Sequence, residues 1–404
     1  MPHKGVVAAG HELTVRAAEI TLRDGGNAFD AILAAHFAAC VAEPVLASLG
    51  GGGFMIAGPC GGEPVVYDFF VQTPRHKRPV DELNFYPVLA DFGTAQQEFH
   101  IGQGTIATPG SVKGIFKIHR DLCSMPLTQI AAPAVGYARD GVTLNRVQAY
   151  IFSVVSEIYR ATPDAREIFS DDSSQDQALV EGGTIRQVQL ADTIEQLATE
   201  GEGLFYRGEI AREIAHFCRD QGGHLTREDL ERYEVVKRKP LDVEYRGTHV
   251  ATNPPPSSGG ILIAFALELL KESNPAKDGF GAYPYLRLLA EVMGLTSKAR
   301  LDALDQSDRP AGLDTRVLSP QYLKRYKEEI GRRAQAIRGT TQLSVIDSRG
   351  NVAGMTVSNG EGCGSIVPDT GIMLNNMLGE QDLNAGGFHL WNENERMTSM
   401  MSPS

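Results

Sequence analysis

The chain has 404 residues, with 38 Lys and Arg against 50 Asp and Glu, and a formal net charge of −12. This acidic balance argues against a nucleic-acid or anionic-membrane partner, because both attract basic patches. Hydrophobic residues make up 42% of the sequence, which is too many for a disordered chain, and no apolar run reaches the roughly 18 residues that a transmembrane helix needs.

The N-terminal part predicts two consecutive helices. Apolar residues at helical spacing indicate a helix over Glu12–Arg23, which ends at Gly25 because glycine readily adopts the left-handed cap. Asn27 is a typical N-cap for a second helix, Ala28–Val41, whose residues are nearly all apolar. We therefore expect this second helix to be buried on several sides.

Two polar side chains lie on the second predicted helix. On so apolar a helix, Asp30 is interpreted as a paired structural carboxylate rather than a catalytic acid. For the same reason His36 is interpreted as a hydrogen-bonded histidine of the core.

Four consecutive glycines, Gly50–Gly53, precede two short predicted strands, Phe54–Ile56 and Pro64–Phe69. The glycines lack both the Lys-Ser/Thr end of a P-loop and the GxGxxG spacing, so a phosphate cradle has little support. A tight passage of the backbone between packed elements is the favoured interpretation.

The rest of the chain predicts helices followed by a β-hairpin. Residues 185–217 and 261–304 look largely helical, and between them Asn253–Gly260 (NPPPSSGG) predicts an irregular loop. After residue 339, Thr340–Asp347 and Val352–Val357 predict two strands joined by a turn that contains glycine. With no flexible linker between the two parts, we predict one α/β unit.

Cysteine and histidine positions indicate no metal chemistry. The five cysteines are scattered and contain no CxxC pair, and the ten histidines show no HExxH motif. The sequence therefore predicts neither a disulfide framework nor a metal site.

Arg338-Gly339-Thr340-Thr341 is the sharpest chemical signal, because it stands directly before a predicted strand. A threonine hydroxyl is a poor nucleophile until the chain is cut before it, when the new α-amine can accept the hydroxyl proton. A preceding glycine tolerates the strained turn that such self-cleavage requires. Taken alone, an ordinary strand start is the better interpretation of these residues.

The order of motifs along the chain changes that interpretation. GGNAFDA at 25–31, Glu43-Pro44 and LGGGGFM at 49–55 are similar to the opening of the γ-glutamyltransferases, a family of N-terminal-nucleophile hydrolases. The resemblance continues in the same order to the end of the chain, through TPGS at 108–111, GHLT at 223–226, YRG at 245–247, PPPSSGG at 254–260, TTQLSVID at 340–347, GIMLNN at 371–376 and SMMSP at 399–403.

The resemblance implies roles for individual residues. Thr340 matches the nucleophile, the bond between Gly339 and Thr340 matches the self-cleavage site, and Thr341 matches the threonine that follows the nucleophile. The other positions that match the family are Ser358, which hydrogen-bonds the nucleophile region, Asn359, which contacts the acyl group, and Ser399, the first of two serines that hold the donor carboxylate.

Several positions depart from the family pattern. Phe70 stands where an arginine binds the donor's α-carboxylate, and Met400 replaces the second serine. Met377 and Glu380 stand where a glutamine and an aspartate hold the donor's amino group; Glu380 can still meet an ammonium. These replacements predict that the nucleophile chemistry is kept while the acyl pocket is more apolar.

The resemblance to the family also implies the architecture and the two subunits that self-cleavage produces. The expected fold is an αββα sandwich in which residues 1–339 form a large-subunit segment and residues 340–404 form a β-rich small-subunit segment. The family continues past the segment matched by 399–403, so we expect the C-terminal part of the fold to be missing.

The implied reaction is acyl transfer from a γ-glutamyl or related amide, such as glutathione, to water or an amine, without a metal or organic cofactor. Two alternatives stay open: an acylase of the same fold acting on a cephalosporin- or glutaryl-type amide, and an uncleaved, inactive binding protein. Expected partners are the small-molecule donor and acceptor and the two subunits themselves, with a homodimer left open. Without a signal-peptide stretch at the N-terminus, we expect a cytoplasmic protein, or a periplasmic or extracellular one if a leader was omitted.

Overall fold

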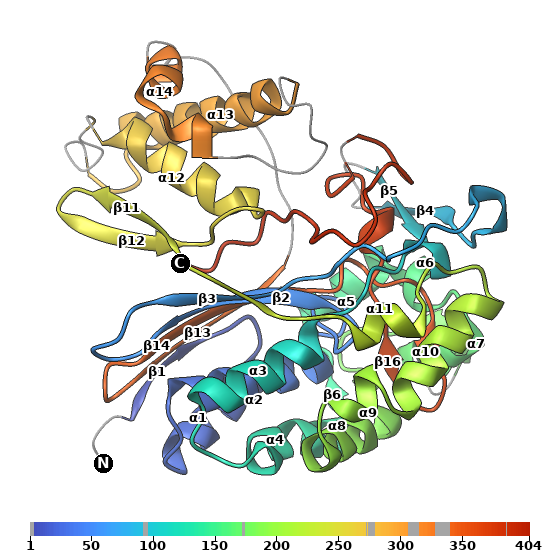
Figure 1. Cartoon of the computed structure of the whole chain (residues 1–404). Coiled ribbons are helices and arrows are strands. Elements are labelled where there is room, and N and C mark those ends of the chain that lie inside the picture. Colours follow the sequence, from blue (N-terminus) through green and yellow to red (C-terminus); the bar gives the residue numbers. More distant parts are fainter. Residues whose placement is uncertain are drawn as a thin grey trace.

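The computed structural model describes residues 4–91, 96–171, 174–271, 273, 279–305, 315–327, 340–384 and 386–404. Its centre is a six-stranded sheet in the order β1-β13-β14-β2-β3-β10, in which all neighbours are antiparallel (Figure 1). The strands are β1 (Gly5–Ala8), β2 (Gly52–Gly58), β3 (Val65–Phe69), β10 (Val236–Arg238), β13 (Thr341–Asp347) and β14 (Val352–Ser358).

The predicted hairpin after residue 339 is confirmed, and it lies inside the sheet. β13 pairs with β1 on one side, and β14 pairs with β2 on the other. The two segments on either side of residue 339 therefore build one sheet together, in agreement with the prediction of a single α/β unit.

Helices cover one face of this sheet, which we call the inner face. Figure 1 shows α1, α2 and α3 against the strands, with α4 and α8 beneath them. The helices of the lower body are α1 (Glu12–Arg23), α2 (Ala28–Ala42), α3 (Ser111–Leu122), α4 (Leu127–Asp140), α5 (Arg146–Val154), α6 (Ser156–Tyr159), α7 (Pro163–Phe169), α8 (Val188–Glu200), α9 (Gly203–Tyr206), α10 (Glu209–Asp220) and α11 (Arg227–Glu231).

The sequence located the first two helices well. α1 has the predicted bounds, and α2 is one residue longer than predicted. The Asn27 side chain caps α2 in a capping box with Asp30, and every residue of α2 is buried. The Asp30 carboxylate also accepts hydrogen bonds from the backbone of Ser124 and Met125, so its interpretation as a paired structural carboxylate is confirmed.

His36, also on α2, differs from its prediction in one respect. The side chain is fully buried as expected, but within the described part of the chain neither ring nitrogen has a hydrogen-bond partner. The ring lies 6.2 Å from that of Phe69, and burial lowers the pKa of His36 to about 4. The histidine is therefore neutral and unpaired rather than hydrogen-bonded.

The four glycines allow close passage of the backbone, as predicted. The Gly51 carbonyl accepts hydrogen bonds from the N–H groups of Gly110 and Ser111. A Cβ on Gly51 would collide with the Ser358 carbonyl, and one on Gly52 would lie 2.9 Å from the Phe69 carbonyl. Glycine is required here because the strands and loops approach within backbone contact distance.

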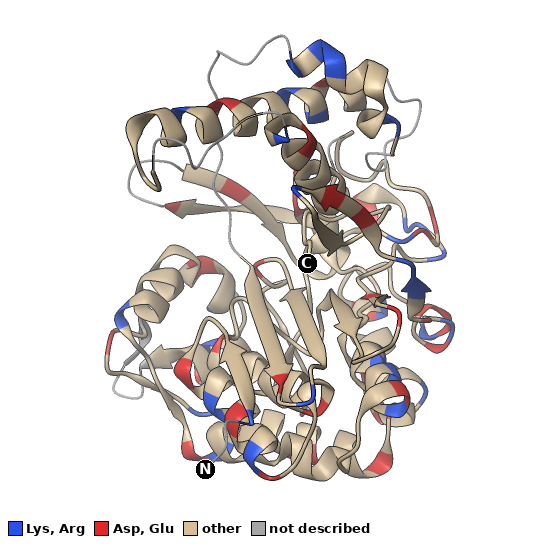
Figure 2. Ribbon diagram, turned by 90° about the vertical axis from the view of Figure 1, so that its left-hand side faces the viewer, with Lys and Arg blue, Asp and Glu red and all other residues tan. Residues whose placement is uncertain are grey.

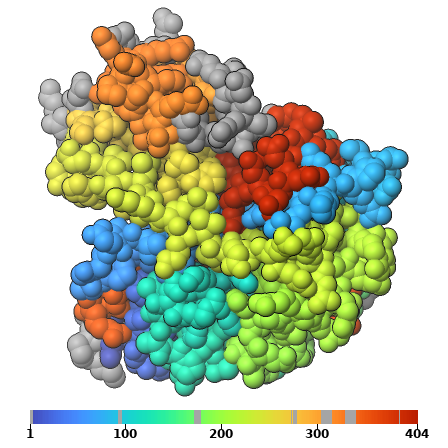
Figure 3. All heavy atoms as spheres, viewed as in Figure 1, coloured from blue at the N-terminus to red at the C-terminus, as the bar shows by residue number. Residues whose placement is uncertain are grey.

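An upper lobe stands above the other face of the sheet, the outer face (Figure 1). It consists of β11 (Leu241–Tyr245), β12 (Thr248–Thr252), α12 (Ser258–Leu270), α13 (Tyr283–Asp305) and α14 (Pro320–Lys327), with its own apolar cluster around Phe265 and Tyr326. Figure 3 shows the surface notched between this lobe and the lower body. Within the described ranges, no helix is both long and apolar enough to cross a lipid bilayer.

The predicted loop at Asn253–Gly260 is correct only for its first part. The prolines precede α12, but Ser258, Gly259 and Gly260 form the first turn of that helix. A Cβ on Gly259 would collide with the Met400 carbonyl. The glycines therefore serve close packing against the C-terminal segment rather than flexibility.

The remaining strands form two-stranded pairs within the described part of the chain. They are β4 (Tyr86–Asp91) with β5 (Gln96–Ile101), β6 (Val142–Thr143) with β9 (Thr184–Ile185), β7 (Ser170–Asp171) with β8 (Ser174–Ala178), β11 with β12, and β15 (Ile366–Val367) with β16 (Ile372–Met373).

Candidate active site

The strand register brings Thr340 to Ser358. The pairing of β13 with β14 begins with Thr341 opposite Val357. Thr340 is the residue just before β13, and extending the register by one residue puts it opposite Ser358. Directly opposite residues in an antiparallel pair have Cβ atoms about 5 Å apart on the same face. Thr340 is exposed and Ser358 is buried at this end of the sheet. Gly339 lies outside the described residues.

The same row of residues continues across the sheet to Phe70. Ser358 is paired with Gly52, and Gly53 is paired with Phe69, which puts Phe70 next to Gly52. Three inter-strand steps separate Thr340 from Phe70, about 14 Å in total. The register therefore places the predicted nucleophile and the residue at the family's arginine position in one row.

Alternation along the strands decides which face each side chain occupies. Thr341, Leu343 and Val345 are buried, whereas Gln342, Ser344 and Ile346 are exposed. Because side chains alternate, Thr340 shares the outer face with Gln342, and Thr341 lies on the opposite, inner face. There the Thr341 hydroxyl donates a hydrogen bond of 2.9 Å to Glu43 Oε2.

The turn after β14 gathers three of the predicted residues. Ser358 Oγ accepts a hydrogen bond of 3.0 Å from the Gly360 N–H. Asn359 is fully buried, and its carbonyl accepts from the Asn376 N–H at 3.3 Å. Gly360 has φ 68°, and a Cβ on it would collide with Asn376 Oδ1 and Glu380 Oε1. Ser358, Asn359 and Glu380 are therefore neighbours.

Ser399 is held against the start of α12. Its carbonyl accepts hydrogen bonds from the Ser258 N–H at 2.9 Å and from Ser257 Oγ at 3.1 Å, and its own hydroxyl accepts from the Met401 N–H. Among the described residues, Ser399 makes no hydrogen bond to Thr340 or Ser358. Met400, next in the chain, is 41% exposed.

Phe70 and Met377 belong to an apolar cluster on the outer face of β2 and β3, which we call the outer cluster. Phe70 is 1% exposed and stacks on Phe54 with ring centroids 5.4 Å apart. The outer cluster consists of Phe54, Ile56, Val66, Phe70, Val71, Ala107, Met377, Leu378, Trp391, Met397 and Met401. Two of the three predicted pocket residues are thus packed against other apolar side chains, whereas the third, Met400, is not in this cluster.

Arg396 lies beside Phe70, and no local sequence pattern indicated it. Its guanidinium donates to the Phe70 carbonyl, to the Tyr233 hydroxyl and, at 2.6 Å, to the Glu234 carbonyl. Nε lies 3.5 Å from Asp68 Oδ1. Since these partners are 162 to 328 residues away in the sequence, only the tertiary structure brings them together.

Neither Cys363 nor a metal-binding group adds chemistry to the site among the described residues. Burial raises the pKa of Cys363 to about 12, and its Sγ donates weakly to the Ser365 carbonyl, so the thiol is not an activated nucleophile. Among the described residues, no group of three or more His, Cys, Asp or Glu side chains is arranged to hold a metal ion.

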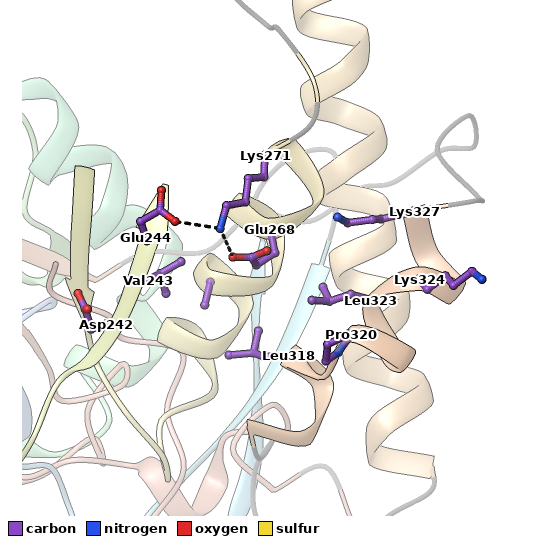
Figure 4. A pocket seen from close by; sticks show the side chains of 11 residues that line it. Asp242, Val243, Glu244, Glu268, Lys271, Leu318, Pro320, Leu323, Lys324 and Lys327 are labelled. Atoms are coloured by element: carbon purple, nitrogen blue, oxygen red, sulfur yellow. Dashed lines mark hydrogen bonds and ion pairs between the residues drawn. The ribbon is translucent and has the colours of Figure 1, made fainter. Parts of the chain in front are cut away.

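A hollow of about 620 Å³ lies in the upper lobe between β11, α12 and α14 (Figure 4). Lys271 reaches across it to Glu244 at 3.4 Å and to Glu268 at 3.3 Å. Its lining comes from residues 242–327 and includes none of the predicted site residues.

Comparison with known proteins identifies the family. The gamma-glutamyltranspeptidase family model matches residues 15–404. The chain belongs to the gamma-glutamyltranspeptidase family. It is an enzyme of the gamma-glutamyltransferase type, and the family suggested by its motifs is confirmed. It is 30% identical to the glutathione hydrolase proenzyme of Escherichia coli (strain K12), over 99% of this chain and 72% of that protein.

Solved structures of the family confirm the fold. The cephalosporin acylase from Bacillus halodurans matches with a TM-score of 0.81 at 25% identity, over 99% of this chain and 74% of that one. The Helicobacter pylori gamma-glutamyltranspeptidase matches with a TM-score of 0.69 at 27% identity, over 82% and 92%. The fold class is that of the N-terminal-nucleophile hydrolases, and the described residues form one six-stranded sheet and five two-stranded ones.

Proposed function

We propose that this protein cleaves amides through a threonyl ester, with Thr340 as the nucleophile. The observation that carries the proposal is the register that sets Thr340 opposite Ser358, beside Asn359 and Glu380. Thr340 Oγ attacks the donor carbonyl while its proton passes to the α-amine of the same residue, which then protonates the leaving amine. Water or an acceptor amine next attacks the ester, releases the acyl group and restores the hydroxyl.

The α-amine is generated by self-cleavage in this proposal. The Thr340 hydroxyl attacks the carbonyl of Gly339, the peptide C–N bond breaks, and an ester joins the two residues. Water hydrolyses that ester, which leaves a carboxylate on Gly339 and a free α-amine on Thr340. The proenzyme names of the relatives fit two subunits from one precursor. The products, 1–339 and 340–404, stay together because β13 and β14 of the second lie between β1 and β2 of the first in one sheet.

Self-cleavage is tested by intact-mass analysis. We expect the purified wild type to give two fragments that separate between Gly339 and Thr340, and Thr340→Ala to stay in one piece. Ser344→Ala is the matched control, because it removes an exposed hydroxyl from the same strand, four residues from Thr340. Cleavage that persists in Thr340→Ala would assign the cut to another protease and remove the basis of the proposal.

The acyl group is proposed to lack the α-carboxylate of glutamate. A buried carboxylate needs a partner, and a bidentate arginine is the usual one. Phe70 is apolar, and the guanidinium of the adjacent Arg396 is already occupied by the Phe70 and Glu234 carbonyls and by Asp68. Relatives of this chain include both glutathione hydrolases and a cephalosporin acylase, which supports the proposal that the residues around Phe70 select the donor.

A donor panel tests the acyl preference. For the cleaved wild type we expect kcat/KM for 4-aminobutyryl anilide, which is γ-glutamyl anilide without its α-carboxylate, to exceed that for γ-glutamyl anilide by at least tenfold. Phe70→Arg should shift that ratio towards the γ-glutamyl donor by at least tenfold, about 1.4 kcal/mol, whereas Phe70→Leu should leave it unchanged. The ratio is independent of how much variant protein folds. A strong γ-glutamyl preference in the wild type would show that another residue binds the carboxylate.

A further inference from the structure

Glu43 joins three elements next to the start of β13. It follows the last residue of α2 as the C-cap and is 6% exposed. One carboxylate oxygen, Oε1, accepts a hydrogen bond of 2.8 Å from Thr14 Oγ1 of α1. The other, Oε2, accepts the 2.9 Å hydrogen bond from Thr341 Oγ1 of β13. A single buried carboxylate thus connects α1, α2 and the residue after Thr340.

The surroundings of Glu43 hold its carboxylate in place. Thr14 lies in the first turn of α1, and a Cβ on Gly10 would lie 2.7 Å from Oε2. Among the described residues, no Lys, Arg or His forms an ion pair with Glu43. Its carboxylate is held instead by hydrogen bonds from the Thr14 and Thr341 hydroxyls.

We infer that Glu43 is a positioning residue for the nucleophile and acts through Thr341. This inference rests on the proposed function. Once the chain is cut, Thr340 is a terminus, and terminal residues are poorly ordered unless they are tied down. The bond between Thr341 and Glu43 holds the inner side of β13 one residue from the terminus. It thereby keeps Thr340 opposite Ser358, where the hydroxyl and the α-amine are needed.

The two threonines that bind Glu43 form a matched pair for the test. Thr341→Val and Thr14→Val each replace a hydroxyl by a methyl group and remove one hydrogen bond to the same carboxylate. Only the first change releases β13. A purely structural role of Glu43 predicts similar effects of the two variants, whereas a positioning role predicts that only Thr341→Val affects turnover.

Steady-state kinetics are measured first, with the best donor of the panel. We expect Thr341→Val to lower kcat at least tenfold with KM changed less than threefold, Thr341→Ser to restore kcat to within threefold of the wild type, and Thr14→Val to stay within threefold. Glu43→Gln should lower kcat. The kcat of the double variant Glu43→Gln/Thr341→Val should lie no more than twofold below that of the less active single variant. Additive losses, or equal losses in Thr341→Val and Thr14→Val, would overturn the inference.

Hydrogen exchange separates this inference from the proposed function. If the wild type neither cuts itself nor turns over any donor, the proposed function fails, and the inference is judged by the amides of 341–343. We expect these amides to exchange at least tenfold faster in Thr341→Val than in Thr14→Val. Equal protection in the two variants would show that the Glu43 bond does not order the start of β13.

Discussion

The two faces of the six-stranded sheet are built differently. The inner face is covered along its length by α1, α2 and α3, and its apolar side chains merge into one cluster that reaches α8 and α10 (Figure 1). The outer face is covered over β2 and β3 by the outer cluster. Over β1, β13 and the start of β14 it is open, with Val6 70% exposed, Ile346 47% and Val352 43%.

The two faces also differ in how their buried carboxylates are paired. Figure 2 shows Lys, Arg, Asp and Glu spread over the helices, with few on the strands of the sheet. On the covered half of the outer face, Asp68 is fully buried, and its Oδ2 accepts two hydrogen bonds from Arg238, at 2.7 and 2.9 Å. The inner face buries its carboxylates among hydroxyl and backbone donors, as with Glu43 and Asp30. The proposed chemistry lies at the border of the covered and open halves, where Thr340 is exposed and Ser358 is not.

The largest expected effect comes from emptying the outer cluster. Phe70→Ala removes a side chain that is 1% exposed and leaves a cavity against Phe54. We expect the free energy of unfolding to fall by about 3–5 kcal/mol in denaturant titrations. Phe280→Ala is the control, because that ring is 93% exposed, and should change stability by less than about 0.5 kcal/mol. Equal effects would show that the outer cluster is not a packed core.

A smaller effect is expected from the unpaired histidine of the inner face. His36→Leu removes two buried nitrogens without partners among the described residues, and should raise the free energy of unfolding by about 1–3 kcal/mol at pH 7.5.

Acid should enlarge that difference. The pKa of His36 is lowered to about 4 in the folded chain. Below about pH 6.5 the His36 side chain is therefore protonated in the unfolded chain but not in the folded one. The His36 contribution to stability therefore falls between pH 6.5 and 4, by about 3 kcal/mol at the most. The variant should lose less stability in this window than the wild type. His216→Leu, exposed on α10, is the control; parallel pH curves for wild type and His36→Leu would contradict the burial argument.

The smallest effect compares two valines on the outer face. Val66 is 0% exposed in the covered half, and Val352 is 43% exposed in the open half. Val66→Ala should cost about 1–3 kcal/mol, and Val352→Ala less than about 0.5 kcal/mol, in thermal or denaturant unfolding. A cost at Val352 that matches the cost at Val66 would show that the open half is covered in solution.

The sequence by itself determined the local elements. Asn27 and Asp30 specify the start of α2 through a capping box that spans four residues, and Gly350, with φ 85°, allows the turn between β13 and β14. The ordered motifs identified the family and assigned Thr340 its proposed role. Such signals are readable because caps, turns and strand alternation depend on residues only a few positions apart.

Only the tertiary structure decided which distant groups meet. Glu43 and Thr341 are 298 residues apart, and Arg396 and Phe70 are 326 apart. The prediction of an apolar acyl pocket rested on Phe70, Met377 and Met400. The structure packs the first two inside the outer cluster, leaves Met400 41% exposed and holds Arg396 against the Phe70 carbonyl. Likewise, His36 was placed in the core by its apolar helix, while its lack of a partner depends on what the folded core supplies. Strand order and the register of β13 against β14 fix these contacts, and no local pattern encodes either one.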